Sequence, residues 1–201
     1  GTGSVFRTDG SVHLDASIQT SEGKMGFVIG MQDTPNPIRV AADLLDEEIN
    51  GLSGDGARLW ADSKGFERSN VQGRPPFEGA TDTVGVVARD KSGLIVCATS
   101  TGGTSNRPPG RVGDVPLPGC GFWVQDGVGV GATGIGEAIT RGMISLRVAD
   151  RILEGNGLEE SMMWALDECL EEDAEVGIIA LGTEGTGHGV SNSTNMPWAS
   201  W

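Results

Sequence analysis

The stretch that decides the fold is Asp82-Thr83-Val84-Gly85-Val86-Val87-Ala88-Arg89-Asp90-Lys91-Ser92-Gly93-Leu94-Ile95-Val96-Cys97-Ala98-Thr99-Ser100-Thr101. Two apolar runs flank a turn sequence at 90–93, which predicts an antiparallel hairpin. A hairpin centred on residue 92 places Thr83 opposite Thr101 and Gly85 opposite Thr99. Directly opposed side chains share one face of the sheet, with Cβ atoms about 5 Å apart.

The segments upstream of the hairpin change from strand-like to helical spacing. The pattern predicts short strands at 5–6, 12–18 and 26–31, then helical sequence over 38–64 that is interrupted at 51–56. Residues 65–82 show no periodicity and are expected to form an exposed connection.

The segments downstream mix the same elements in another order. We expect a loop at 102–121, strands at 122–124, 128–132 and 176–181, helices at 137–154 and 158–171, and a polar tail. Strict strand–helix alternation is missing, so the 201 residues predict a single layered α+β domain.

Composition excludes several classes of protein. The 28 acidic and 14 basic residues give a formal charge of −14, and a nucleic-acid binder needs a basic surface. No apolar run reaches the roughly 18–20 residues of a membrane span. The three cysteines form no C-x-x-C pair, so we expect no metal site and no cofactor. An odd number of cysteines suits a reducing compartment, which predicts a cytoplasmic protein.

Three features resemble functional sites, and each has a simpler interpretation. Residues 129–134 fit G-x-G-x-x-G, but hairpins surround them and no βαβ unit does, so we expect no dinucleotide site. Backbone N–H groups at this strand-to-helix turn can still hold an anion.

His13 and His188 are the only histidines, and neither flanks a nucleophile elbow, so both are predicted to be structural. Cys120 has no nearby base and is predicted to be a packed thiol.

Thr83 can supply both halves of a nucleophile–base pair. If the chain is cut between Asp82 and Thr83, the threonine carries a hydroxyl and a free α-amine. An α-amine has a pKa of about 7.7–8, which suits a general base at neutral pH. An ordinary Thr–Thr pair in a sheet explains Thr83 and Thr101 equally well, so these residues alone leave both interpretations open.

Four segments together resemble the isoaspartyl peptidase/L-asparaginase family of N-terminal nucleophile hydrolases, which also includes glycosylasparaginase and taspase. They are Asp82-Thr83-Val84-Gly85-Val86-Val87-Ala88, Thr99-Ser100-Thr101-Gly102-Gly103, Pro109-Gly110-Arg111-Val112-Gly113-Asp114 and Ala132-Thr133-Gly134-Ile135-Gly136-Glu137. Their order and spacing match the family, residues 1–18 resemble its early strands, and the likeness extends over most of the chain.

The resemblance implies a role for each matching residue. Thr83 would be the nucleophile that self-cleavage at Asp82–Thr83 releases, dividing the chain into residues 1–82 and 83–201. Thr101 would polarise its hydroxyl, with Thr99 beside it. The remaining roles are binding of the substrate's α-carboxylate and α-amino group by Arg111 and Asp114, oxyanion stabilisation by Thr133 and Gly134, and a backbone contact to substrate from Gly136.

The resemblance also implies a fold and an activity. The fold would be a four-layer αββα sandwich that lacks the family's first strand and helix, together with its cation-binding loop. The substrates would be β-aspartyl peptides and L-asparagine, and family members commonly form dimers of cleaved protomers, so we expect a homodimer. Two alternatives stay open, a glycosylasparaginase-type amidase and a truncated, non-catalytic amino-acid-binding relative. Gly102-Gly103 favours the asparaginase branch, whereas Thr104 replaces a larger apolar residue and leaves the leaving-group preference undetermined.

Overall fold

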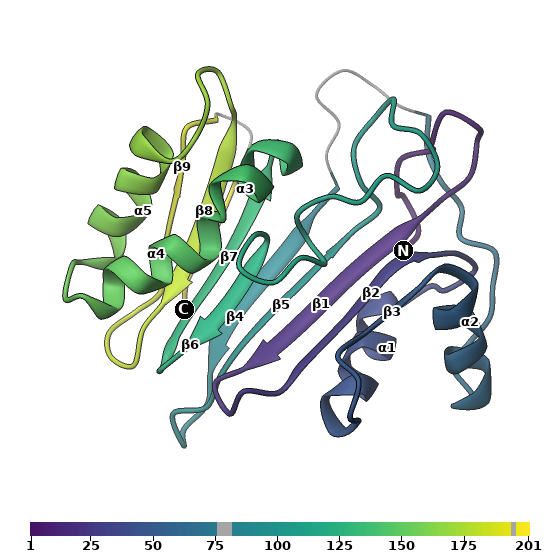
Figure 1. The fold of residues 1–201 in the computed structure, drawn as a ribbon, viewed down its shortest axis with the longest axis horizontal. Coiled ribbons are helices and arrows are strands. Elements are labelled where there is room, and N and C mark those ends of the chain that lie inside the picture. Colours follow the sequence, from purple (N-terminus) through teal and green to yellow (C-terminus); the bar gives the residue numbers. More distant parts are fainter. Residues whose placement is uncertain (76–81, 194–195) are drawn as a thin grey trace.

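The protein, described here by a computed structural model over residues 1–75, 82–193 and 196–201, contains two β-sheets and five α-helices in that part of the chain (Figure 1). The five-stranded sheet has the order β3-β2-β1-β5-β4, and the four-stranded sheet has the order β6-β7-β8-β9. The strands of the first sheet are β1 (Leu14–Thr20), β2 (Met25–Met31), β3 (Gly51–Ser53), β4 (Val84–Arg89) and β5 (Ile95–Thr101). Those of the second are β6 (Phe122–Gln125), β7 (Val128–Gly134), β8 (Val176–Leu181) and β9 (His188–Ser191).

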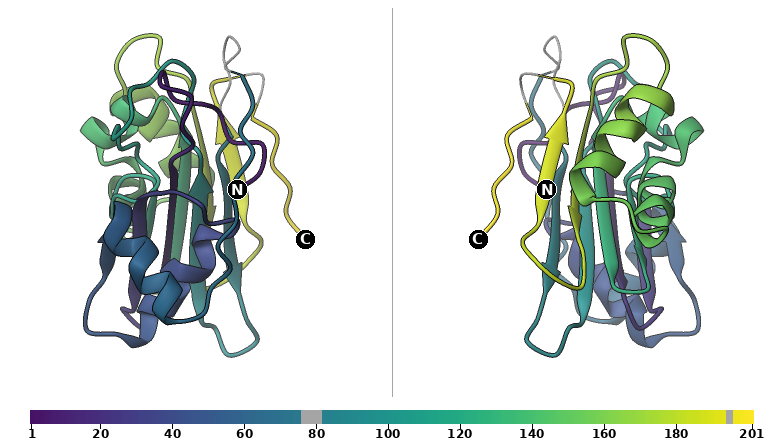
Figure 2. Two further views of the ribbon diagram at one scale, coloured as in Figure 1. Left: turned by 90° about the vertical axis from the view of Figure 1, so that its right-hand side faces the viewer. Right: turned by 90° about the vertical axis from the view of Figure 1, so that its left-hand side faces the viewer.

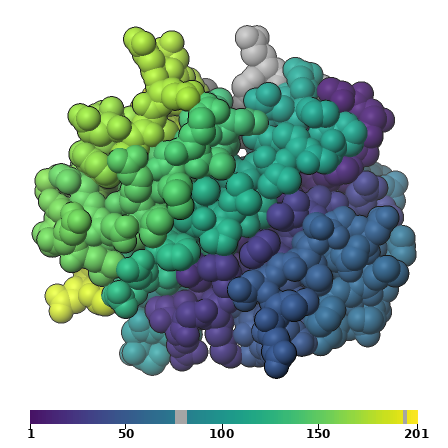
Figure 3. All heavy atoms as spheres, in the orientation of Figure 1, coloured from purple at the N-terminus to yellow at the C-terminus, as the bar shows by residue number. Residues whose placement is uncertain are grey.

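The helices form two groups, one against each sheet. Helices α1 (Pro37–Asp43) and α2 (Gly54–Ser63) contact the first sheet, and a 3₁₀ turn (Leu44–Asp46) follows α1. Helices α4 (Ile144–Leu153) and α5 (Leu158–Glu168) contact the second sheet, while α3 (Gly136–Gly142) follows β7. The two groups lie on opposite sides of the view in Figure 1, and Figure 3 shows the same division on the surface.

Strand β1 is buried on both faces, and its side chains are suited to the surroundings of each face. Leu14 and Ala16 pack in an apolar cluster with α1 and α2. Ser17 and Gln19 point to the opposite face, because alternate residues of a strand do so. There the Gln19 side chain donates to the Val124 carbonyl at 2.9 Å and accepts from the Val124 N–H at 3.0 Å. A polar side chain thus joins the two sheets without leaving a buried amide unsatisfied.

The sheets approach each other closely where β4 and β5 contact β7. Glycines of β7 make this approach possible. A Cβ on Gly129 would lie 2.6 Å from Val87 Cγ1 and 2.8 Å from Ile95 Cγ2. The Cys97 thiol donates to the Val130 carbonyl across the same interface at 3.3 Å.

The hairpin prediction is confirmed in position and register. Strands β4 and β5 are antiparallel, with Gly85 opposite Thr99 and Val84 opposite Ser100. The predicted strands 122–124, 128–132 and 176–181 are also confirmed, as β6, β7 and β8. Residues 102–121 contain no helix or extended strand.

Three predictions of local structure are wrong, those for residues 5–6, for the helix 137–154 and for the polar tail. Residues 5–6 form only an isolated bridge from Val5 to Arg74, because no neighbouring strand extends the ladder. The predicted helix 137–154 is divided at Met143, which has a left-handed φ of 45°. The polar tail forms β9 by pairing with β8. By contrast, the helical sequence predicted over 38–64 is found in α1 and α2, and β3 lies in its predicted interruption at 51–56, where it pairs in parallel with β2.

The remaining expectations for the fold concern the glycine motif, the connection and the membrane. Residues 129–134 lie in β7, an antiparallel strand between β6 and β8, so within the described residues no βαβ unit surrounds the motif. The connection 65–82 has no helix or extended strand over 65–75, and its residues 76–81 lie outside the described residues. None of the helices in the described ranges is long and apolar enough to cross a membrane.

The contact between the sheets gives a test of stability. We expect Gly129→Ala to lower the free energy of unfolding by about 1–3 kcal/mol, because overpacking forces the facing side chains apart. The control is Gly56→Ala in α2, where a new Cβ meets nothing within 4 Å and stability should rise by roughly 0.5–1 kcal/mol. Urea unfolding of the two variants measures both effects, and equal stabilities would contradict this account of the interface.

Candidate active site

Three side chains form a hydrogen-bonded chain at the start of β4. The Thr83 hydroxyl donates to Thr101 Oγ1 at 3.0 Å, and the Thr101 hydroxyl donates to Asp82 Oδ1 at 2.9 Å. Thr101 Oγ1 also accepts the Gly103 N–H at 2.9 Å. The hairpin register places Thr83 beside Thr101, and the peptide bond places Asp82 next to Thr83. A proton leaving the Thr83 hydroxyl therefore has a continuous path to a carboxylate.

The Asp82 carboxylate sits in a group of donors contributed by distant segments. Besides the Thr101 hydroxyl, Gly102 N–H donates to Oδ1 at 2.8 Å and Val5 N–H donates to Oδ2 at 3.3 Å. A Cβ on Gly102 would lie 2.6 Å from Asp82 Oδ2 and would also collide with Ser4. Glycine at 102 is thus what allows the backbone to approach the carboxylate.

Thr99 lies two residues before Thr101 on the same face of β5 but makes different contacts. It is buried, and its hydroxyl shares a 2.6 Å hydrogen bond with the Ser17 hydroxyl, which also donates to the Val115 carbonyl. Thr99 therefore links β5 to β1 through a buried hydrogen bond next to Thr101.

Arg111 and Asp114 approach each other at Gly136. A Cβ on Gly136 would lie 2.7 Å from both Arg111 Nη2 and Asp114 Oδ1, so only glycine fits between the two side chains. Arg111 forms a fork with Glu137, donating from Nε at 3.1 Å and from Nη2 at 2.9 Å. Glu137 orients the guanidinium, so the expected pair of Arg111 and Asp114 is a group of three residues. We call Arg111, Asp114 and Glu137 the Arg111 group.

Two carboxyls, that of Asp114 in this group and that of Asp15, are buried without full hydrogen bonding. Asp114 is 6% exposed, and burial raises its pKa to about 7. Asp15 is 1% exposed, and burial raises its pKa to about 6 although Gly30 N–H donates to Oδ1 at 2.7 Å. Over residues 1–75, 82–193 and 196–201, the Oδ2 atom of each has no hydrogen-bond partner. Such atoms indicate a place where a ligand with donors can bind.

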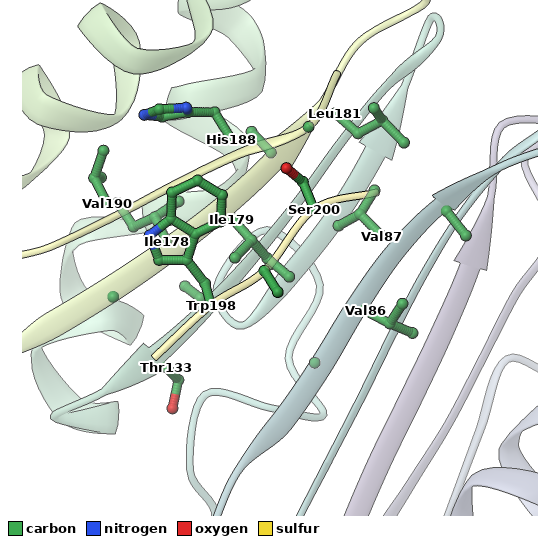
Figure 4. A pocket seen from close by; sticks show the side chains of 18 of the residues that line it. Val86, Val87, Thr133, Ile178, Ile179, Leu181, His188, Val190, Trp198 and Ser200 are labelled. Atoms are coloured by element: carbon green, nitrogen blue, oxygen red, sulfur yellow. The ribbon is translucent and has the colours of Figure 1, made fainter. Parts of the chain in front are cut away.

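Thr133 and Gly134 end strand β7. Gly134 has a φ of 135°, and a Cβ there would collide with the Glu175 carbonyl. Ile135 N–H donates to the same carbonyl at 2.9 Å, which turns the chain from β7 into α3. Thr133 lines the cavity that Thr83 also lines (Figure 4).

The cavity has a volume of about 710 Å³ and lies between β4 and β8. Its walls include Val86 and Val87 of β4, Ile179 of β8 and Trp198 of the C-terminal segment (Figure 4). The C-terminal segment covers the face of the second sheet that α4 and α5 do not cover (Figure 2). Neither Arg111 nor Asp114 is among the described residues that line this cavity.

Two histidines and one cysteine are predicted to be structural, and one of them, His188, lines the cavity (Figure 4). His13 bonds to the Gln32 side chain at 2.9 Å, and His188 packs on Trp198 with ring centroids 5.0 Å apart. Cys120 is a buried free thiol, and burial raises its pKa, so the prediction of a packed thiol is confirmed. Within the described ranges no group of three or more His, Cys, Asp or Glu is placed to hold a metal ion.

Sequence reasoning missed three charged residues of the site. Glu137 ended a quoted motif without a role, and only the fold brings it to Arg111. Asp15 lies in the predicted strand 12–18, where the sequence analysis gives it no role. An acid between the apolar residues Leu14 and Ala16 is nevertheless a recognisable sign of a buried carboxyl. Arg7 is 3% exposed in a loop beside Gly103, and no pattern in the sequence indicated its burial.

Comparison with known proteins gives a consistent result. The family model described as Asparaginase matches residues 1–75 and 69–201. The chain is 40% identical over 184 residues to a plant-type L-asparaginase of Pyrobaculum calidifontis, covering 78% of this chain and 60% of that protein. It is 32% identical over 223 residues to an isoaspartyl peptidase/L-asparaginase of Bos taurus, covering 99% of this chain and 72% of that protein. An isoaspartyl peptidase of Salmonella typhimurium is 34% identical over 187 residues, with 79% and 59% covered. The chain thus spans about three fifths to three quarters of the length of these relatives.

The burial of Asp114 predicts a pH-dependent stability. A carboxyl whose pKa is raised by folding holds its proton more tightly in the folded chain, so the folded state loses stability as the pH rises from about 4 to about 7. We expect unfolding free energy to fall across this range by on the order of 1–4 kcal/mol, and Asp114→Asn to remove much of the slope. Urea unfolding at pH 5 and pH 7.5, in a Thr83→Ala background, measures it.

The matched control is Asp167→Asn on the exposed face of α5, which should keep the slope of the parent chain. An Asp114→Asn slope equal to that of the control would show that Asp114 titrates normally.

Proposed function

The chain belongs to the asparaginase family, and from this premise we propose that it is a self-cleaving threonine hydrolase that releases aspartate from β-aspartyl peptides and L-asparagine. The observation that carries the proposal is the hydrogen-bonded chain from Thr83 through Thr101 to Asp82, located at the bond that must be cut. An ordinary threonine pair in a sheet would not need a carboxylate at its end.

The first reaction is cleavage of the chain. The Thr83 hydroxyl oxygen attacks the main-chain carbonyl carbon of Asp82, while its proton passes through the Thr101 hydroxyl to the Asp82 carboxylate. The Asp82–Thr83 C–N bond breaks, and the nitrogen takes up the proton, which leaves Asp82 as an ester on Thr83 Oγ1. Water hydrolyses this ester, forming a carboxylate at the end of residues 1–82 and restoring the hydroxyl of Thr83, which now also carries a free amine.

The second reaction is turnover of substrate. The Thr83 amine accepts the hydroxyl proton as Oγ1 attacks the side-chain carbonyl of an aspartyl substrate. The C–N bond breaks, the leaving amine or ammonia takes the proton, and an aspartyl ester remains on Thr83. Water attacks this ester with the amine again accepting a proton, and aspartate leaves.

The Arg111 group is suited to the common aspartyl part of both substrates. The α-carboxylate would bind the Arg111 guanidinium, whose orientation Glu137 fixes through Nε and Nη2. The α-ammonium would bind Asp114, whose buried Oδ2 has no other partner. Binding of a cation there would favour the ionised form of a carboxyl that burial otherwise keeps protonated.

Thr133 and Gly134 are proposed to stabilise the oxyanion with a hydroxyl and an N–H. The shared cavity wall of Thr133 and Thr83 supports this role, as does the φ of Gly134. Loss of one oxyanion donor in other hydrolases lowers kcat on the order of 10²–10³ fold.

We extend the proposal to the architecture. Facing sheets with helices against each support a four-layer αββα sandwich in one domain, composed of residues 1–82 and 83–201. The homodimer and the cytoplasmic location stay predictions.

Self-cleavage is tested on a denaturing gel with N-terminal sequencing. We expect the wild-type chain to give fragments of 82 and 119 residues, the second beginning at Thr83. Thr83→Ala should remain one chain without amidase activity. Thr101→Val should slow cleavage by roughly 10²–10⁴ fold, because the path to the Asp82 carboxylate is interrupted.

The matched control is Thr20→Val. Thr20 is a buried threonine of β1 whose hydroxyl has no partner, so this variant should cleave at the wild-type rate. A Thr83→Ala chain that still splits at this bond, or a wild-type chain that hydrolyses asparagine while uncut, would overturn the mechanism.

The role of Glu137 gives a second kinetic test. We expect Glu137→Gln to raise the KM for asparagine by about tenfold with a smaller effect on kcat, because the charged fork that orients Arg111 is lost. Glu171→Gln is the control, since Glu171 forms a comparable but exposed pair with Arg141 at 2.6 Å. A change confined to kcat would assign Glu137 to another step.

A further inference from the structure

Asp82 occupies a carboxylate-binding site that the uncut chain fills from within. Three donors from two separate segments converge on its oxygens: the Thr101 hydroxyl and Gly102 N–H at the end of β5, and Val5 N–H near the N-terminus. We call this group, together with Arg7, the Asp82 cradle. Backbone N–H groups that converge on one carboxylate form an anion site that does not depend on the identity of the residue bound there.

Arg7 supplies an unused positive charge next to these donors. Its side chain is 3% exposed, and none of its three guanidinium nitrogens has a hydrogen-bond partner among the residues that the structure describes. The guanidinium lies against Gly103, where a Cβ would be 2.7 Å from Nη1 and 2.9 Å from Nη2. Burial lowers the pKa of Arg7, while the charges of Asp15 and Asp82 act in the opposite direction. A buried cation that lacks partners is strongly unfavourable unless another molecule supplies them.

Cleavage allows another carboxylate to replace that of Asp82 in the Asp82 cradle. In the uncut chain Asp82 is held in place by its peptide bond to Thr83. After the cut proposed above, Asp82 is the end of a separate segment and can leave the donors, which then face the nucleophile. The open site would hold a carboxylate beside Thr83 and beside the positive charge of Arg7.

We propose that the Asp82 cradle binds the carboxylate of the leaving amino acid in a β-aspartyl dipeptide, with Arg7 as the residue that selects it. This inference rests on the proposed function. A β-aspartyl dipeptide has two carboxylates, and the Arg111 group is assigned to the one on the aspartyl part. The second carboxylate belongs to the leaving amino acid, and asparagine has no equivalent. The cradle therefore favours dipeptides over asparagine.

The experiment compares a β-aspartyl-leucine dipeptide with its C-terminal amide and with asparagine, using cleaved enzyme. We expect the wild type to show a kcat/KM at least tenfold higher for the free acid than for the amide, since charge-assisted hydrogen bonds contribute about that much. In Arg7→Met the ratio of acid to amide should fall to near one, and Arg7→Lys should give an intermediate ratio because it keeps the charge but not the fork.

The control is Arg39→Met on the exposed face of α1, which should keep the wild-type ratio. Cleavage and thermal unfolding are measured for each variant, and Arg7→Lys carries the test if Arg7→Met does not fold. A wild type without preference for the acid, or an Arg7 variant that lowers kcat/KM equally on all three substrates, overturns the inference. A wild type that neither cleaves itself nor hydrolyses any of the three overturns the proposed function instead.

Discussion

The register of the β4–β5 hairpin is the constraint on which the site depends. It sets Thr83 against Thr101, and chain connectivity then sets Asp82 where it can accept a hydrogen bond from Thr101. A slip of one residue would turn Thr101 to the other face of the sheet and break the proton path. The same alternation directs Cys97 and Thr99 toward the second sheet, so packing between the sheets and the position of the nucleophile are fixed together.

Around this hairpin the protein buries ionisable side chains whose hydrogen bonding is incomplete within the described residues. Asp15, Asp114 and Arg7 are buried, and each has polar atoms without partners. Buried charges of this kind lower stability, and they are found where a ligand completes the hydrogen bonding. In the proposed reaction the substrate does this, with its ammonium on Asp114 and its carboxylates on Arg111 and in the Asp82 cradle. Glycines at 102, 103 and 136 leave the space in which these groups approach one another.

The parts of the fold that were predictable are those where local patterns and packing agree. The hairpin, β6, β7 and β8 combine strand-forming residues with turn signals, and β5, β6, β7 and β8 each bury alternate or successive side chains. The errors occur where tertiary pairing overrides the local pattern. Strand β3 forms in the predicted interruption at 51–56 because β2 offers it a parallel edge, and β9 forms because β8 offers it an antiparallel edge. Met143 divides one helical pattern into α3 and α4 through a left-handed turn that its sequence does not favour.

The sequence by itself determined the hairpin, its register, and therefore the meeting of Thr83 with Thr101, because strand pairing about a short turn is a local matter. It also determined, through four motifs in order, the residues of the Arg111 group other than Glu137. Only the tertiary structure decided that Glu137 holds Arg111, that Val5 and Gly102 enclose the Asp82 carboxylate, and that Arg7 is buried without partners. These contacts join segments up to 77 residues apart. Burial depends on what every other segment covers, and no local pattern encodes it.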